Sequence, residues 1–183
     1  MTGAGAALPD LPAAIAALAP ALRVGYAVAV WSVLSRMVAC KTDGGTGALD
    51  QMVIAEYFSR HFDDHIAHLS KVLGAKLDVM MAALEEQFGT SLQMQRPEGG
   101  IFLWMKLPDG VDVTRLIKPA AAAGIIFNPG PEWACNGDKS KPYLRLCFAL
   151  PSHETIRAGV AAFARVCYEE LGIPAQSANV RHA

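Results

Sequence analysis

The stretch that most constrains the fold is residues 96–107, RPEGGIFLWMKL, which predicts a tight turn followed by an apolar strand. Pro97 fixes its own φ and favours an extended backbone at Arg96. Gly99 and Gly100 allow a left-handed backbone or a close backbone approach. The residues from 101 to 107 are apolar except for Lys106, with 101, 103, 105 and 107 on one face and 102 and 104 on the other. We therefore expect a strand that is covered on both faces.

Composition limits the class of protein. The 183 residues are long enough for one good domain, or for a small domain and a piece of another. A formal net charge of −1 with 18% charged residues argues against a general nucleic-acid binder, which would need a basic surface. The positive mean hydropathy of +0.26 indicates apolar surface that a binding partner would cover.

Neither a membrane span nor a secretory signal is expected. The apolar region 11–34 is interrupted by Pro12, Pro20 and Arg23, so it contains no uncharged run of about 20 residues. Arg23 is also the first basic residue, whereas a signal peptide needs positive charge ahead of its apolar stretch. The four cysteines are Cys40, Cys135, Cys147 and Cys167, and their spacing does not suit a zinc site. This favours reduced thiols and a cytoplasmic protein.

The first third of the chain predicts one strand and two helices. We expect a buried strand over 22–30 and helices over 32–41 and 48–60. The residues expected on the inner faces of these helices are Val33, Leu34, Met37, Val38, Leu49, Met52, Val53, Tyr57 and Phe58. A longer helix should start at an N-cap, Asp63 or Asp64, and end before Gly89. The composition shift near Phe62 predicts a domain boundary there, which gives domains 1–62 and 63–173; no order is expected in 1–18 or 174–183.

The second domain should be α+β, within an α/β protein overall. Strands are predicted over 91–95, 101–107, 125–127 and 143–149, with helices over 112–123 and from Ser152 to Leu171. Pro119 falls inside the first of these helices and should kink or shorten it.

Arg145 is the leading candidate for a functional residue. It shares a strand face with Tyr143 and Cys147, while Leu144 and Leu146 alternate toward the core. A guanidinium in mid-strand is costly to bury without an anion, and its planar fork suits a carboxylate. The alternative is an arginine on a solvated face or paired with a local glutamate. Arg23, at the start of a predicted strand, could bind a phosphate or could simply face solvent.

Two other groups of residues have simpler explanations. His61, His65 and His68 have helical spacing, but no carboxylate or cysteine joins them at ligand spacing. They are interpreted as the polar face of a helix, and no metal is expected. Trp31, Trp104 and Trp133 are interpreted as core or lid aromatics.

Four segments together resemble a known family: APALRVGY at 19–26, PEGGIFLW at 97–104, NPG at 128–130 and YLRL at 143–146. In this order they resemble the C-terminal half of class I/II, fold-type I pyridoxal-phosphate aminotransferases. The nearest group includes 2-aminoadipate aminotransferases and the aminotransferase-like half of MocR-type regulators. The resemblance covers residues 19–171.

The resemblance implies a fold and roles. The chain would be the C-terminal lobe of a fold-type I transferase, with a remnant of the large cofactor domain in 1–62. Arg23 would help bind the phosphate of pyridoxal 5′-phosphate, and Arg145 the α-carboxylate of an amino acid or 2-oxo acid. Gly99 and Gly100 would border the substrate entrance. The family works as dimers, so a homodimer or an association with a missing N-terminal half is expected.

The sequence also departs from the family pattern. Ala16 stands where the family has the lysine that forms the Schiff base, and Ala21 replaces a motif glycine. The upstream cofactor domain is missing, so we expect no catalytic residue, and neither transamination nor cofactor retention by this chain alone. Three hypotheses remain: the C-terminal part of an aminotransferase, a non-catalytic protein that binds a carboxylate or a protein partner, or the effector fragment of a MocR-type regulator. No basic patch supports DNA contact.

Overall fold

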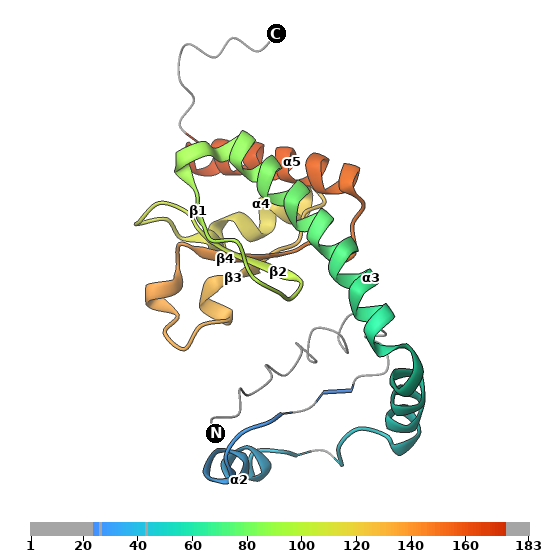
Figure 1. Cartoon of the computed structure of the whole chain (residues 1–183). Helices are drawn as coiled ribbons and strands as arrows, with labels where there is room; N and C mark the ends of the chain where they lie inside the picture. The colour runs from blue at the N-terminus through green and yellow to red at the C-terminus, as the bar shows by residue number, and fades with distance from the viewer. Residues whose placement is uncertain (1–23, 26, 43, 175–183) are drawn as a thin grey trace, which may run out of the picture. The chain divides into compact units, whose positions relative to one another are not determined.

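The computed structural model describes residues 24–25, 27–42 and 44–174 (Figure 1). It divides the chain into two compact units, 1–71 and 72–183, which are described separately. Arg23, Ala16, segment 1–18 and all but the first residue of the predicted tail 174–183 lie outside the described residues. The predicted domain boundary near Phe62 stays a prediction.

The first unit contains helix α2 (Trp31–Ala39) and the first part of helix α3 (Ala48–Phe88). The helix predicted over 32–41 is confirmed as α2. The strand predicted over 22–30 is wrong for its described residues, because no strand of the described chain pairs with them and Val28 is 76% exposed. The predicted inner faces are also wrong except at Leu34 and Phe58, which are half-buried. The residues that are exposed instead are Val33, Met37, Val38, Leu49, Met52, Val53 and Tyr57.

Helix α3 is continuous over 41 residues, so the predicted N-cap at Asp63 or Asp64 is wrong. No proline or glycine interrupts the helix there, and both carboxylates are exposed, so they need no special partner. The apolar spacing at the far end is confirmed, since Leu77, Met80, Leu84 and Phe88 are buried. Gly89, with φ at +49°, follows the last helical residue as predicted.

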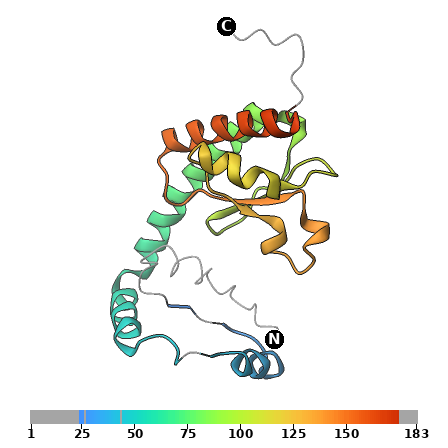
Figure 2. The ribbon, with the colours of Figure 1, turned by 180° about the vertical axis from the view of Figure 1, so that it is seen from behind.

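The second unit is built on a four-stranded antiparallel sheet in the order β1-β2-β4-β3. Its strands are β1 (Gln93–Met94), β2 (Phe102–Lys106), β3 (Asn128–Pro129) and β4 (Tyr143–Cys147). The end of α3, helix α4 (Ile117–Ala122) and helix α5 (His153–Leu171) all lie on the same side of this sheet (Figures 1 and 2). The segment between β3 and β4 lies on the other side (Figure 1).

One hydrophobic core joins the sheet to its helices. Leu103 and Met105 of β2 and Leu144 and Leu146 of β4 point into it, as the alternation predicts. Helix α5 contributes Ile156, Val160, Phe163, Val166 and Cys167, which also confirms its predicted inner face. The predicted cap of α5 is confirmed, since Ser152 Oγ accepts the Thr155 N–H at 3.1 Å.

The remaining differences between the predicted and the observed secondary structure are in short elements. Residues 125–127 are not a strand, because Ile126 is 88% exposed and the pairing with β4 falls on Asn128 and Pro129 instead. Of the predicted strand 91–95, only Gln93 and Met94 pair. The helix predicted over 112–123 is split into a 3-10 helix, Val113–Leu116, and α4. Pro119 lies in the first turn of α4, where an N–H needs no helical partner.

Strand β2 is covered on one face only, which corrects the expectation of two buried faces. Leu103, Met105 and Leu107 are at most 1% exposed, but Trp104 is 38% exposed and Phe102 is half-buried. The sheet is antiparallel, and such sheets can leave one face open. None of the helices in the described ranges combines the length and the apolar character that crossing a membrane requires.

Candidate functional site

The open face of the sheet carries a cluster of aromatic and cationic side chains. Phe102, Trp104 and Lys106 of β2 share this face with Tyr143, Arg145 and Cys147 of β4. In register, Trp104 pairs with Arg145 and Phe102 with Cys147. The two strands are therefore neighbours in one sheet, and their side chains on this face lie close together.

The guanidinium of Arg145 lies between two aromatic rings. Its Cζ is 3.7 Å from the ring centroid of Phe102 and 3.6 Å from that of Trp133. Two rings cannot occupy one face of the guanidinium at these distances, so they cover opposite faces. Cation–π contacts of this kind stabilise a charge that is partly removed from water.

Asn128 of β3 holds one edge of the same guanidinium. Its Oδ1 accepts hydrogen bonds from Arg145 Nε at 3.3 Å and from Nη2 at 3.1 Å. An arginine has five N–H donors. Among the residues that the structure describes, no other acceptor and no carboxylate bonds to the remaining three, on Nη1 and Nη2. This end of the guanidinium can take an anion in two parallel hydrogen bonds.

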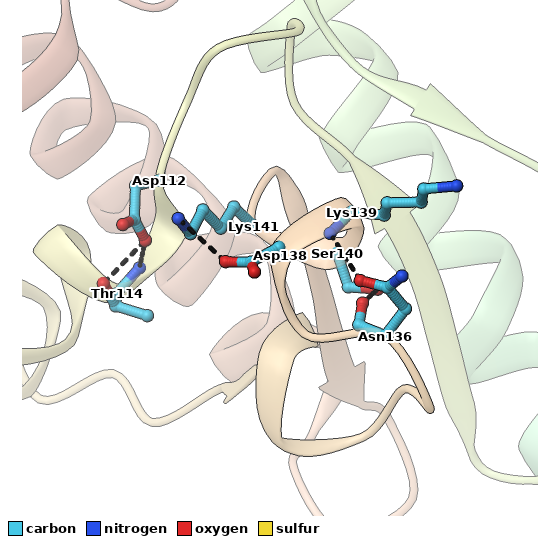
Figure 3. Close-up of polar contacts among 7 residues, drawn as sticks. All are labelled: Asp112, Thr114, Asn136, Asp138, Lys139, Ser140 and Lys141. Atoms are coloured by element: carbon cyan, nitrogen blue, oxygen red, sulfur yellow. Dashed lines mark hydrogen bonds and ion pairs between the residues drawn. The ribbon is translucent and has the colours of Figure 1, made fainter.

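The segment that carries Trp133 is held in place by its own polar contacts (Figure 3). Asn136 accepts the Lys139 N–H through its side chain at 3.2 Å, and its carbonyl accepts the Ser140 hydroxyl at 2.8 Å. Gly130, at the start of the segment, is so close to the backbone that an added Cβ would lie 2.4 Å from the Ser140 carbonyl oxygen. The ring above Arg145 is therefore carried by a well-anchored segment.

A stacked pair of aromatic side chains lies beside Arg145 on the same face of the sheet. Trp104 and Tyr143 stack with centroids 5.7 Å apart, and Lys106 Nζ is 5.8 Å from the Tyr143 centroid. Lys106 also pairs with Asp109 at 2.7 Å. This hydrogen bond raises the pKa of Lys106 above its ordinary value.

The other predicted site residues are Gly99, Gly100 and Arg23. Gly99 and Gly100 are exposed, with φ at +83° for Gly100, in the turn that leads into β2. The Ile101 carbonyl accepts the Phe148 N–H at 3.1 Å, so the glycines lie at the end of β2 next to the end of β4. Arg23 lies outside the described residues.

Sequence reasoning missed three contributors to the site. Phe102 was assigned to a covered face, Trp133 was considered a core or lid residue, and Asn128 was noted only as part of a motif. The signal available for Asn128 was its place in the NPG segment, which resembles the family pattern.

The histidines show no metal-binding arrangement among the described residues, which contain no group of three suitable side chains. His65 Nδ1 lies 3.2 Å from the Tyr57 hydroxyl. All four cysteines are free, and only Cys167 is buried.

Comparisons with known proteins agree on one fold and one family. The family model for aminotransferase class I and II matches residues 16–163. The crystal structure of LysN, an α-aminoadipate aminotransferase from Thermus thermophilus complexed with N-(5′-phosphopyridoxyl)-L-leucine, superposes with a TM-score of 0.72. It is 32% identical, and the match covers 85% of this chain and 40% of LysN. The sheet and its helices are thus the C-terminal lobe of a fold-type I transferase.

Curated relatives include both enzymes and regulators. A 2-aminoadipate transaminase of Thermus thermophilus is 33% identical over 150 residues, 81% of this chain and 38% of the relative. An uncharacterized HTH-type transcriptional regulator of Bacillus subtilis, YdfD, is 30% identical over 146 residues, 78% of this chain and 30% of that protein. The chain belongs to the class I and II aminotransferase family. It spans about two fifths or less of the length of these relatives.

Enzymes of this family depend on pyridoxal phosphate, but the described residues do not fit that cofactor. A Schiff base needs a lysine amine. Among the described residues, Lys106 lies on this face, but its ammonium pairs with Asp109, and the ammonium groups of Lys141 and Lys76 bind Asp138 and the Ala149 carbonyl. The three N–H groups of Arg145 that no described residue accepts remain available to an anion.

Proposed function

We propose that this chain is the C-terminal part of a cytoplasmic pyridoxal-phosphate-dependent aminotransferase, and that Arg145 binds the α-carboxylate of an amino acid or 2-oxo acid. The observation that carries the proposal is the Arg145 guanidinium, which contacts Phe102, Trp133 and Asn128 and has three N–H donors that no described residue accepts. A preorganised, partly desolvated guanidinium favours bidentate carboxylate binding. The exposed Gly99–Gly100 turn would border the route by which the ligand enters.

The same proposal assigns no catalytic residue to this chain. Ala16 occupies the position of the Schiff-base lysine, and an alanine cannot form the imine that transamination requires. Arg23 would contribute to binding the cofactor phosphate in the complete active site. Transamination would then need a second polypeptide region that supplies the lysine, and the family suggests a dimeric assembly.

Ligand binding tests the first part of the proposal. We expect 2-oxoglutarate to bind the wild-type chain in a calorimetric or NMR titration. Arg145→Ala should weaken binding by tenfold or more, since hydrogen bonds to charged groups contribute about 1.5–3 kcal/mol. Arg145→Lys should also bind weakly, because an ammonium cannot form the planar fork. Arg157→Ala, on the exposed surface of α5, is the control. Equal binding by Arg145→Ala would refute the assignment.

Cofactor absorbance tests the second part. After incubation with pyridoxal phosphate and removal of the excess, the chain should show no lysine-linked aldimine band. A stable band that disappears on reduction with borohydride and leaves a labelled lysine would overturn the interpretation of Ala16.

A second candidate is the effector part of a transcriptional regulator, which the match to YdfD favours. The DNA directly upstream of the Met1 codon would separate the two. A cofactor-binding half with no helix-turn-helix segment ahead of it supports the enzyme, and a helix-turn-helix segment ahead of such a half supports the regulator.

A further inference from the structure

We propose that Trp133 and Phe102 are positioning residues that make Arg145 selective for planar carboxylates over tetrahedral oxyanions. This inference rests on the proposed carboxylate-binding role of Arg145 and adds a specificity to it.

Access to the guanidinium is restricted on both faces and along one edge. Both faces are covered, by rings whose centroids lie 3.6 and 3.7 Å from Cζ. The edge formed by Nε and Nη2 is occupied by Asn128 Oδ1. An anion can therefore approach only in the guanidinium plane, toward Nη1 and the free N–H of Nη2.

The shape of the anion then decides how well it fits. A carboxylate is planar and can place both oxygens in the guanidinium plane, where each accepts one N–H. A sulfonate or phosphate that binds two N–H groups keeps further oxygens above or below that plane. Those oxygens would meet the ring faces, whose quadrupole is negative. The two rings therefore penalise a tetrahedral anion, whereas a planar one can bind in the guanidinium plane without meeting them.

Trp133 is the ring whose removal should disturb the hydrophobic core least. Its side chain is 53% exposed, whereas Phe102 is half-buried in the sheet face. The segment around Trp133 is anchored by the Asn136, Lys139 and Ser140 contacts, which do not involve the indole (Figure 3). Loss of the ring should thus open one face of Arg145 without disturbing the core.

The test compares two monoanions of equal charge, acetate and methanesulfonate, binding to the full chain at constant ionic strength. Binding is followed through the tryptophan indole N–H resonances and the Arg145 side-chain N–H in ¹H–¹⁵N spectra. Wild type should prefer acetate. Trp133→Leu should bind acetate about fivefold more weakly, the factor expected for one lost cation–π contact. It should also lose most of the preference over methanesulfonate, and Trp133→Phe should restore both.

The outcomes separate this inference from the proposed function. If Arg145→Ala abolishes acetate binding but Trp133→Leu keeps the wild-type preference, the selectivity proposal is wrong and the carboxylate role stands. If wild type binds neither anion, or Arg145→Ala binds acetate as wild type does, both proposals fail. Should Trp133→Leu lose its far-UV circular dichroism spectrum, Phe102→Leu and Trp133→His test the same two rings.

Discussion

Trp104 and Arg145 occupy directly opposed positions in β2 and β4, yet each side chain stacks on a diagonal neighbour. Arg145 lies over Phe102, one pair toward the start of β2, and Trp104 stacks on Tyr143. The side chains of β4 therefore lean in one direction across the sheet, and diagonal neighbours remain within reach of long side chains. This offset separates an arginine held by two rings from an aromatic pair next to it.

A double-mutant cycle should detect the aromatic pair. Trp104→Leu and Tyr143→Leu remove the two stacked rings, and offset-stacked pairs contribute about 0.5–1.5 kcal/mol beyond their buried area. We expect a coupling free energy in that range from urea unfolding of the two single variants and the double variant. The matched cycle of Trp104→Leu with Tyr168→Leu, an exposed residue of α5, should be additive within about 0.5 kcal/mol. Additivity in the first cycle would show that the stack contributes nothing.

Thiol labelling should separate the cysteines by burial. Cys40, Cys135 and Cys147 are exposed, while Cys167 is fully buried in α5. Burial raises the pKa of the Cys167 thiol to about 12, so its reactive thiolate is absent at neutral pH. A thiol reagent should modify three cysteines in the native protein and four in denaturant, as counted by mass spectrometry. Rapid native labelling at Cys167 would contradict the packing of α5.

Local signals predicted the second unit well. Alternation placed Leu144 and Leu146 in the core, and Ser152 marked the start of α5, because periodicity and capping depend on nearby residues alone. The long helix was predicted with a false start at Asp63, since a good N-cap residue is also tolerated on an exposed helical surface.

Tertiary relationships were harder to predict. Residues 22–30 have the composition of a buried strand, but a strand needs a partner and a covering layer, and neither is a local property. The Arg145 site joins Phe102, Asn128 and Trp133 from three separate segments. The alternation in β4 identified the arginine, whereas its partners depend on strand order and on the path of residues 130–142.

The N-cap at Asp112 should make stability depend on pH in the acid range. Hydrogen bonds from the Thr114 hydroxyl at 2.6 Å and the Thr114 N–H at 3.0 Å lower the pKa of Asp112 below its usual 3.8. A lowered pKa in the folded state stabilises the protein above the unfolded-state pKa, and this contribution is lost as pH falls through the folded-state pKa.

Asp112→Ala should therefore lower the free energy of unfolding at pH 7 by about 1 kcal/mol, a usual value for an N-cap. The difference from wild type should shrink below pH 3.8 in urea titrations. Asp138→Ala removes an exposed ion pair with Lys141 and should change stability by less than about 0.5 kcal/mol. A pH-independent difference between Asp112→Ala and wild type would refute the role of the charge.

Two glycine-to-alanine substitutions should have opposite effects on stability. At Gly130 a Cβ would lie 2.4 Å from the Ser140 carbonyl oxygen and 2.7 Å from that of Tyr143, both backbone atoms that cannot move independently. Gly130→Ala should destabilise the protein by about 1–3 kcal/mol, as overpacking does. Gly159 lies within α5 and has nothing within 4 Å of the added Cβ, so Gly159→Ala should stabilise by about 0.5–1 kcal/mol.

The same two substitutions also test whether the close packing at Gly130 positions Trp133 in the site. Because Gly130 begins the segment that carries Trp133, Gly130→Ala should also shift the Trp133 indole and the Arg145 Nε–H resonances in ¹H–¹⁵N spectra, while Gly159→Ala leaves both unchanged. A Gly130→Ala protein with wild-type stability and an unshifted indole would show that the backbone of residues 130–142 is looser than the close approach at Gly130 implies, and that Trp133 reaches Arg145 without support from this segment.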